Sequence, residues 1–452
     1  MTSRATGIPM EGMIPLDKLA APATHSTTAL RSYVPALDGV RGLAILVVMC
    51  CHFVWVVSEY APPPDKLSRL VVEVFKSGRY GVDLFFVLSG FLITGILFDA
   101  KSDKHYFRNF YARRTLRIFP LYYCVLLIAF VVAPLFVSWN SPGERQVVHN
   151  QAWLWLYMGN VKNSFVGPEF FQQDRLWMGH FWSLAIEEQF YLVWPLLILL
   201  LNRRSAMIAC VGMIVGAPLL RIGLMSGLPY PKGLFAAIYF TFCKLDTLAL
   251  GALLALVARA PGGLVRYAKL APWVFLLCGA MLAPMLFLKW DKASFMGAVS
   301  ESAKLSTICF FSGSLLVLAV SSTPEKLVGW VFTTPIMRFF GKYSYGLYVF
   351  HELLAPLFNW KLGVLSLQRH LGGSWHVAMF LHMLLAGLIS IGVSLVSWHV
   401  MEKHMLKLKR FFEHAPQPRP GKQEPTRAPE VPPPPDTHAP VTLQVTSGRL
   451  AG

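Results

Sequence analysis

Residues 37–53 read LDGVRGLAILVVMCCHF and place Arg41 and His52 inside an apolar stretch that is long enough, with its flanks, to span a membrane. On a helix with 3.6 residues per turn, the step from Arg41 to His52 falls within roughly 20° of three full turns, so both side chains share one face, about 16 Å apart. Ionisable groups in a bilayer are costly unless they are paired or line a cavity. We therefore expect a functional site on this face; a structural pair is the alternative.

The composition predicts an all-α, polytopic membrane protein. Hydrophobic residues make up 55% of the chain and charged residues 14%, and the mean hydropathy is +0.50. Apolar runs of about 20 residues, the length that crosses a bilayer, recur along the chain. They predict about ten transmembrane helices, near residues 37–58, 80–98, 118–138, 182–201, 206–222, 233–257, 268–288, 306–322, 343–360 and 377–400.

The basic residues predict the orientation in the membrane. The net charge of +17 would suggest nucleic acid in a soluble protein, but Lys and Arg gather here in the loops 99–117, 203–204 and 403–410. Positive loops are cytoplasmic, so an even number of spans places both termini inside and the segment 139–181 outside. The loop 59–79, which this orientation places outside, carries four basic residues and therefore argues against the orientation. We expect the lipid bilayer, and no nucleic acid, as a partner.

The chain divides into three parts by composition. Residues 1–36 are polar and show no cleavable signal peptide, so the first span is the expected insertion signal. Residues 37–410 form the predicted transmembrane domain. Residues 411–452 are rich in proline and polar residues, which predicts a disordered tail. The seven cysteines show no C-x-x-C spacing, so we expect neither disulfides nor a metal site.

The second span begins GVDLFFVLSGFLIT, residues 81–94, with Asp83 at its outer end. The small residues Ser89, Gly90 and Gly95 predict close contact with another helix. A carboxylate just inside an apolar run requires a partner, such as an arginine, a histidine or the first-turn amides of its own helix. A catalytic role and a capping role for Asp83 both stay open.

A basic block, FRNFYARRTLRIFP at residues 107–120, leads into the third span. Arg114 and Arg117 lie three residues apart and therefore share a helix face. Two guanidinium groups so placed can bind an anionic group, as phosphate-binding arginines do. The alternative is an interfacial anchor that contacts lipid phosphates.

Two adjacent acids enter the membrane in WMGHFWSLAIEEQFYLVWP, residues 177–195. Glu187 and Glu188 point about 100° apart on a helix, so at most one of them shares a given cavity. Span order brings His52, Asp83 and one of the two glutamates to a similar depth, where a carboxylate can orient the imidazole. His180, just before the span, is expected to be an exposed polar residue.

Later spans carry further ionisable residues. Lys244 and Asp246 lie in FCKLDTLALG, and His351 and Glu352 in GKYSYGLYVFHELL. Each could line the same cavity as His52. Alternatively, Lys244 and Asp246 neutralise each other or neighbours, and His351 is a hydrogen-bonded core residue.

The order and spacing of these motifs resemble the acyltransferase-3 family of integral membrane O-acyltransferases, which includes bacterial polysaccharide and lipopolysaccharide O-acetyltransferases. The resemblance covers roughly residues 37–410. It rests on LDGVRG with the R-x10-H spacing, GVDLFFVLSGFLIT, FYARRTLRIFP, WSLAIEEQFYLVWP, KLDTLALGALLA, YSYGLYVFH and a final MEK. His404 stands where the family often has a proline, and Cys51 where many members have an aromatic or apolar residue.

The resemblance implies an enzyme that moves an acyl group, usually acetyl, from cytoplasmic acyl-CoA to a hydroxyl of a carbohydrate or glycolipid on the outer side of the cell membrane. It implies acetyl-CoA as a substrate, no permanently bound cofactor, and a role in the cell envelope. Some members carry a further soluble domain; we expect the tail to be too short to supply one, and therefore a stand-alone transferase. The residues that it assigns to activity or donor binding are His52, Arg41, Arg114, Arg117 and either Glu187 or Glu188.

The implied mechanism agrees with the chemistry of these residues. A sugar hydroxyl is a weak nucleophile, so His52 would act as a general base, with Glu187 or Glu188 orienting it. Arg41 could bind the pantetheine or phosphate end of the donor while Arg114 and Arg117 hold its phosphates. The rival hypothesis is a proton-coupled transporter that uses the same groups as a relay, although the sequence lacks the inverted repeats typical of that class. An inactive sensor or scaffold is a third alternative.

Overall fold

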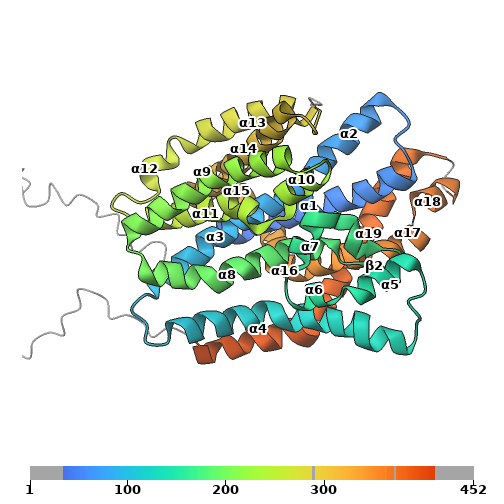
Figure 1. Cartoon of the computed structure of the whole chain (residues 1–452), viewed down its shortest axis with the longest axis horizontal. Coiled ribbons are helices and arrows are strands. Elements are labelled where there is room, and N and C mark those ends of the chain that lie inside the picture. Colours follow the sequence, from blue (N-terminus) through green and yellow to red (C-terminus); the bar gives the residue numbers. More distant parts are fainter. Residues whose placement is uncertain (1–33, 288–290, 362, 371–372, 413–452) are drawn as a thin grey trace, which may run out of the picture. The chain divides into compact units, whose positions relative to one another are not determined.

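The computed structural model describes residues 34–412, apart from 288–290, 362 and 371–372, and is almost entirely helical (Figure 1). Within these residues the only strands are β1 (Gln172–Gln173) and β2 (Leu176–Trp177), which pair antiparallel. The predicted all-α class is confirmed. The predictions for the N-terminal segment and the proline-rich tail fall on residues 1–33 and 413–452, which lie outside the described residues.

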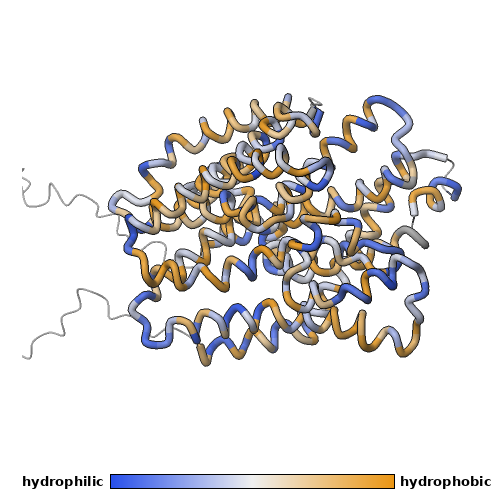
Figure 2. Tube along the Cα trace, viewed as in Figure 1, coloured by the Kyte–Doolittle hydropathy of each residue, from blue (hydrophilic) through white to orange (hydrophobic). Residues whose placement is uncertain are grey.

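Among the described residues, eight helical segments are long and apolar enough to cross a membrane. Figure 2 shows the apolar residues along the helices. The chain is therefore a multi-pass membrane protein. The helices in these segments are α1 (Pro35–Tyr60), α2 (Lys66–Lys76) continuing through η3 (Ser77–Tyr80) into α3 (Gly81–Asp99), α4 (Tyr106–Leu127) with η4 (Ile128–Val132) and η5 (Ala133–Leu135), η7 (Gly179–Phe181) with α8 (Trp182–Leu200), α9 (Arg203–Gly227), η8 (Thr241–Lys244) with α11 (Leu245–Ala258), α14 (Phe295–Ser321), and α19 (Trp375–Ser397) with η9 (Trp398–Glu402), α20 (Lys403–Lys407) and η10 (Leu408–Phe412).

Two further predicted spans correspond to helices that are shorter or more charged than those above. The first, α13 (Ala271–Phe287), is apolar but has only 17 residues. The second, α16 (Pro335–Leu353), carries Arg338, Lys342 and Glu352 within its 19 residues. Short helices in the second half of the described chain include α12 (Val265–Ala268), α15 (Leu327–Thr333), α17 (Ala355–Lys361) and α18 (Val364–His370).

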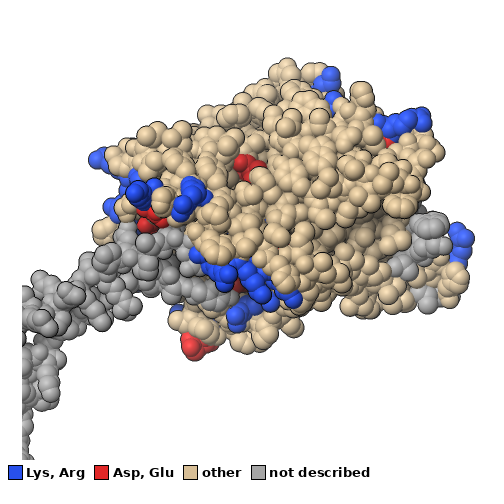
Figure 3. All heavy atoms as spheres, turned by 90° about the horizontal axis from the view of Figure 1, so that it is seen from below, with Lys and Arg blue, Asp and Glu red and all other residues tan. Residues whose placement is uncertain are grey.

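The outer surface agrees with a bilayer environment. Figure 3 shows a broad area with few charged side chains, with groups of Lys and Arg towards its edges. Large apolar side chains such as Leu127, Ile128 and Val131 are exposed on the segment that contains α4. A soluble protein rarely exposes continuous apolar surface of this kind, whereas lipid tails cover it at no cost.

Helix α1 is defined by signals at both of its ends. Val34 is extended, Pro35 occupies the first turn with its preset backbone angle, and Asp38 adds a favourable negative charge there. The helix ends before Pro62, the first of three consecutive prolines that cannot continue it. The single helix therefore carries both Arg41 and His52, as predicted.

Glycines bring two pairs of helices into close contact. A Cβ atom on Gly341 of α16 would collide with the backbone carbonyl of Asp38 on α1. A Cβ atom on Gly90 of α3 would collide in the same way with the carbonyl of Leu248 on α11. Because only glycine fits at these positions, α1 packs directly on α16 and α3 on α11, as small residues allow in membranes.

The predicted span 233–257 is wrong as one continuous helix. The chain forms α10 (Lys232–Tyr239), turns through an extended Phe240, and resumes with η8 and α11. The residues on both sides of Phe240 are apolar, so the hydropathy of the sequence could not reveal this break. The break places Lys244 and Asp246 at the beginning of a separate helix.

The segment 139–181 is structured rather than a plain loop. It contains α5 (Pro142–His149), α6 (Ala152–Trp155), α7 (Gly159–Val166), η6 (Pro168–Phe171), the β1–β2 hairpin and η7. Arg175 donates from Nε to Oε1 of the buried Glu144 at 2.6 Å. This hydrogen bond holds the pKa of Glu144 below its usual range. The ion pair fixes the hairpin against α5 and so positions the residues on either side of it.

Candidate active site

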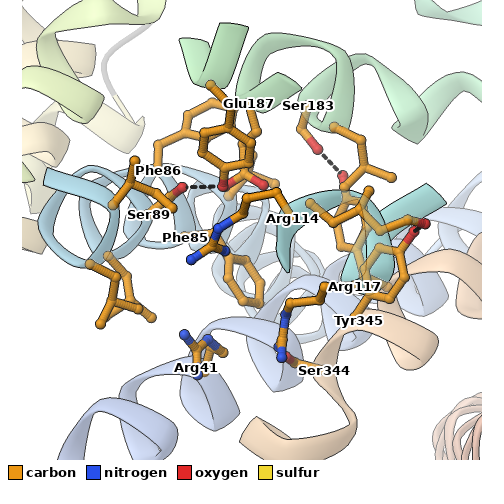
Figure 4. A pocket seen from close by; sticks show the side chains of 18 residues that line it. Arg41, Phe85, Phe86, Ser89, Arg114, Arg117, Ser183, Glu187, Ser344 and Tyr345 are labelled. Atoms are coloured by element: carbon orange, nitrogen blue, oxygen red, sulfur yellow. Dashed lines mark hydrogen bonds between the residues drawn. The ribbon is translucent and has the colours of Figure 1, made fainter. Parts of the chain in front are cut away.

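A partly open cavity lies between α1, α3, α4, α8 and α16, and Figure 4 shows it from close by. Its lining combines cationic, acidic, hydroxyl and apolar side chains. The polar and charged residues of this lining are Arg41, Arg114, Arg117, Glu187, Ser89, Ser183, Ser344, Tyr191, Tyr345 and Tyr348.

Three arginines that the sequence singled out meet at this cavity. Arg41 comes from α1, and Arg114 and Arg117 come from α4, where their three-residue spacing puts both on the cavity side (Figure 4). Arg41 donates from Nη1 to Oδ1 of Asp38 at 2.8 Å. The guanidinium of Arg114 lies 5.6 Å from the ring centre of Tyr191, a cation–π distance. The arrangement gives the cavity a concentrated positive charge that suits an anionic ligand.

A second cavity adjoins the first, since Arg41 and Arg117 line both. Its other cationic residues are Arg338 and Lys342 of α16, and the ammonium of Lys342 lies 5.4 Å from the ring centre of Trp398. The sequence analysis did not identify this group. It lies at the Arg41 end of α1, so the positive lining continues beyond the first cavity.

Glu187 and Glu188 occupy different environments, as their angular separation predicted. Glu187 lines the cavity beside the hydrogen-bonded hydroxyl groups of Ser89 and Tyr191. Glu188 is not among the lining residues, and its Oε1 is buried with no hydrogen-bond partner among the described residues. The catalytic role assigned to either glutamate stays a prediction, and the geometry favours Glu187 for contact with a ligand.

Tyr348 connects the lining of the cavity to a second group of polar residues. Tyr348 lines the cavity, and its hydroxyl contacts Ser183 Oγ at 2.5 Å and donates to the carbonyl oxygen of His180 at 2.9 Å. The ring of Tyr348 also lies 5.6 Å, centre to centre, from the ring of His351. Tyr348 therefore lies between the cavity and His351, which does not itself line the cavity.

His52 belongs to a cluster of histidines, and its neighbours differ from those predicted from the sequence. Its Nδ1 lies 2.8 Å from Nε2 of His351, and its Nε2 lies 3.8 Å from Oε2 of Glu352. The expectation that Glu187 or Glu188 orients the imidazole is not met: both its ring nitrogens face α16. We call His52, His180, His351 and Glu352 the histidine cluster.

The segment 139–181 completes the histidine cluster. His180 of η7 places Nδ1 3.2 Å from Oε2 of Glu352, and the side-chain amide of Gln172 on β1 donates to Oε1 of the same carboxyl group. His180 is only 2% exposed, so the prediction of an exposed polar residue is wrong. Sequence could not reveal this burial, because it depends on how the hairpin folds over the helix ends.

Asp83 has a partner of its own. Nζ of the buried Lys244 donates to Oδ1 of Asp83 at 2.8 Å, across the close contact between α3 and α11. Asp246 pairs instead with Arg221 of α9, Nη2 to Oδ2 at 2.8 Å. Lys244 and Asp246 are therefore neutralised by neighbours, one of the two alternatives. Asp83 is not among the residues that line the cavity, so the structure favours an ion-pairing role for it.

The histidine cluster has some features of a metal site. One potential ligand atom from each of His52, His351 and Glu352 lies within 4.8 Å of the others. Two nitrogens bound to the same tetrahedral Zn²⁺ at about 2.0–2.1 Å would be roughly 3.3 Å apart. The 2.8 Å between His52 Nδ1 and His351 Nε2 is shorter than this and suits a hydrogen bond. The geometry favours a hydrogen-bonded pair over a shared ion.

Comparison with known proteins identifies related sequences. A family model described as "Acyltransferase domain" matches residues 34–399. The peptidoglycan O-acetyltransferase OatA of Listeria monocytogenes is 28% identical over 353 residues, which cover 74% of this chain and 51% of that protein. The O-acetyltransferase OatA of Staphylococcus aureus is 28% identical over 341 residues, or 72% of this chain and 51% of that protein. The chain thus spans about half the length of these relatives. No solved structure matches it.

Proposed function

Because the chain belongs to the acyltransferase-3 family, we propose that it is a membrane O-acyltransferase that moves an acetyl group from acetyl-CoA to a hydroxyl of a cell-envelope carbohydrate. One observation carries this proposal: three arginines line a cavity whose Tyr348 side chain also lies beside the histidine cluster that contains His52. An anionic donor and a basic catalyst are the two elements that such a transfer requires.

The arginine-lined cavities fit coenzyme A. Its phosphates would contact Arg114 and Arg117, whose forked guanidinium groups suit phosphate oxygens. The adjoining cavity offers Arg338, Lys342 and the Trp398 ring, a set that can hold a further phosphate and stack on a purine. Arg41 lines both cavities, so the pantetheine arm would pass it on the way to the histidine cluster. The acyl group would then lie near Ser183 and Tyr348.

The chemistry proposed for the histidine cluster is a direct acyl transfer. His52 takes the proton of the acceptor hydroxyl while the oxygen attacks the thioester carbonyl, and this general-base step contributes about 100-fold or more. The new carbon–oxygen bond forms as the carbon–sulfur bond breaks. The sulfur leaves with the bonding electrons and takes the proton back from His52, so that free coenzyme A and an O-acetyl ester result.

The acceptor proposal rests on the relatives. Both carry O-acetyltransferase in their names, and the Listeria protein is named for peptidoglycan. We propose an extracytoplasmic carbohydrate or glycolipid of the same general class for this chain, with the bacterial cell membrane as its location and the Arg41 end on the cytoplasmic side. The side chain of His52 is 27% exposed, which leaves room for a hydroxyl to reach it.

Label transfer from acetyl-CoA tests the proposed function. Inside-out membrane vesicles that contain the protein would receive labelled acetyl-CoA, and glycans and lipids would then be extracted and treated with mild base. We expect base-labile label in a glycan fraction. Vesicles without the protein, and sealed right-side-out vesicles that hide the cytoplasmic face, should show none. Folded protein with endogenous acceptors but no labelled product would contradict the proposal and favour the transporter hypothesis.

The donor site gives a separate prediction for Arg117. Replacing it with glutamine should raise the KM for acetyl-CoA by about 10-fold to 100-fold, because a charge-assisted hydrogen bond contributes roughly 1.5–3 kcal/mol. The kcat should change less, since the interaction holds the donor before and during the reaction alike. Steady-state kinetics in vesicles measures both constants. Arg113→Gln is the matched control, because Arg113 is on the same helix but does not line the cavity; an equal effect in both variants would refute the assignment.

A further inference from the structure

The contact between His52 and His351 determines which ring nitrogen of His52 carries a hydrogen, as well as the position of the two rings. His351 is fully buried on α16, and its Nε2 lies 2.8 Å from Nδ1 of His52. One of these two nitrogens must carry a hydrogen and the other must accept it. The remaining contacts of His351 decide which nitrogen is the donor.

The second ring nitrogen of His351 faces only acceptors. Its Nδ1 lies 2.8 Å from the carbonyl oxygen of Tyr348 and 3.1 Å from that of Leu347. A carbonyl oxygen cannot donate, so Nδ1 of His351 must carry the hydrogen. A neutral imidazole has only one N–H, and therefore Nε2 of His351 is an acceptor.

It follows that Nδ1 of His52 is the donor in the pair. We infer that His351 is a positioning residue that holds His52 in its Nδ1–H form, so that Nε2 is the nitrogen that takes the proton from the acceptor hydroxyl. This inference rests on the proposed function for its catalytic meaning. The hydrogen-bond argument itself depends only on the contacts of His351.

The other groups around His52 agree with this assignment. Oε2 of Glu352 lies 3.8 Å from Nε2 of His52, beyond hydrogen-bond distance, so this carboxyl group does not hold a hydrogen on Nε2. His180 donates from Nε2 to the carbonyl oxygen of Val349 at 3.2 Å, which leaves its Nδ1 facing Glu352. Within the described chain, His351 is the hydrogen-bond partner of His52 Nδ1 and so sets the orientation of that nitrogen.

A neutral imidazole suits this position in a membrane. In the serine protease triad a buried aspartate fixes the histidine in the corresponding form, and its replacement by asparagine leaves the wrong form and lowers kcat by about 10⁴. A carboxylate at the place of His351 would bury a further charge in an apolar interior. The backbone carbonyls of Leu347 and Tyr348 polarise His351 instead, and none of its own hydrogens moves during the reaction.

Two substitutions separate this role from simple packing. His351→Gln supplies an amide oxygen that can accept from His52 Nδ1, whereas His351→Leu fills similar space with no acceptor. We expect the glutamine variant to retain transfer within about 10-fold of the wild type, and the leucine variant to lose at least about 100-fold in kcat with an unchanged KM for acetyl-CoA. The control is His382→Leu, which removes another buried histidine, on α19, and should leave kcat unchanged.

Equal losses in the glutamine and leucine variants, both folded by size-exclusion chromatography, would overturn the inference. Nitrogen-15 NMR of the wild-type protein in membranes gives an independent test, because protonated and unprotonated ring nitrogens resonate in separate ranges. The inference requires a hydrogen on Nδ1 of His52 and none on Nε2; the reverse result would refute it. This measurement needs no turnover, so a wild-type protein without transfer activity would refute the proposed function while the NMR result still decided the role of His351.

Discussion

His52→Ala is expected to lower acetyl transfer by at least about 100-fold, because it removes the only group proposed to take the proton of the acceptor hydroxyl. Binding of acetyl-CoA should persist, since the donor-binding Arg41 lies three helical turns, about 16 Å, along α1 from His52. The measurement is label transfer in inside-out vesicles, combined with the KM for acetyl-CoA wherever residual turnover allows it.

The control for this variant is His399→Ala. His399 is an exposed residue of η9, and its Nδ1 lies 2.8 Å from the backbone carbonyl oxygen of Leu395 in the same helical segment. Its replacement should leave transfer and folding unchanged. Substantial transfer by a folded His52→Ala protein would exclude His52 as the base and would shift attention to Glu187, the acid that lines the cavity.

Arg221→Leu is expected to destabilise the protein by about 3–5 kcal/mol, the largest stability effect that we anticipate. Arg221 is 1% exposed, pairs with Asp246, and donates from Nη1 to the carbonyl oxygen of Cys243 at 2.7 Å. Its removal leaves the buried carboxylate of Asp246 without its counter-charge. Thermal unfolding in detergent, followed with a thiol-reactive dye, measures the loss because Cys210, Cys243 and Cys309 are buried.

Two comparisons test the reason for this loss. The double variant Arg221→Leu/Asp246→Leu removes both charges and should recover most of the stability, since replacing a whole buried pair by apolar residues is often neutral. Arg259→Leu breaks a more exposed pair with Asp99, whose side chain is 36% exposed, and should cost less than about 1 kcal/mol. A double variant as unstable as Arg221→Leu would show that packing, not charge, dominates.

Several parts of the site could be predicted because they depend on one helix. The shared face of Arg41 and His52, the pairing of Arg114 with Arg117 and the divergence of Glu187 from Glu188 all follow from helical periodicity. The apolar runs likewise predicted the membrane class. The sequence also contained a signal for the role of Arg221, because this residue is a lone arginine in the predicted span 206–222. Its role was nevertheless not predicted.

The partners of these residues could not be predicted, because they depend on which helices pack together. His351 is 299 positions from His52 in the sequence, and the two meet only because glycine lets α16 approach α1. His180 and Gln172 reach Glu352 through a hairpin whose fold leaves no periodic signal. Depth in the membrane suggested Asp83 and Glu187 as partners for His52, but depth alone does not define which way a side chain points.

The placement of Arg41 and His52 on the single helix α1 has an evolutionary consequence. Their separation is fixed by the rise of the helix rather than by contacts between distant segments, and Gly341 holds α16 against the same helix. Substitutions in the segment 139–181 can therefore change how a ligand approaches His52 without changing the distance between Arg41 and His52. This fixed spacing would let new acceptor preferences arise by substitutions in the covering segment that keep His180 and Gln172, while the distance between Arg41 and His52 stays the same.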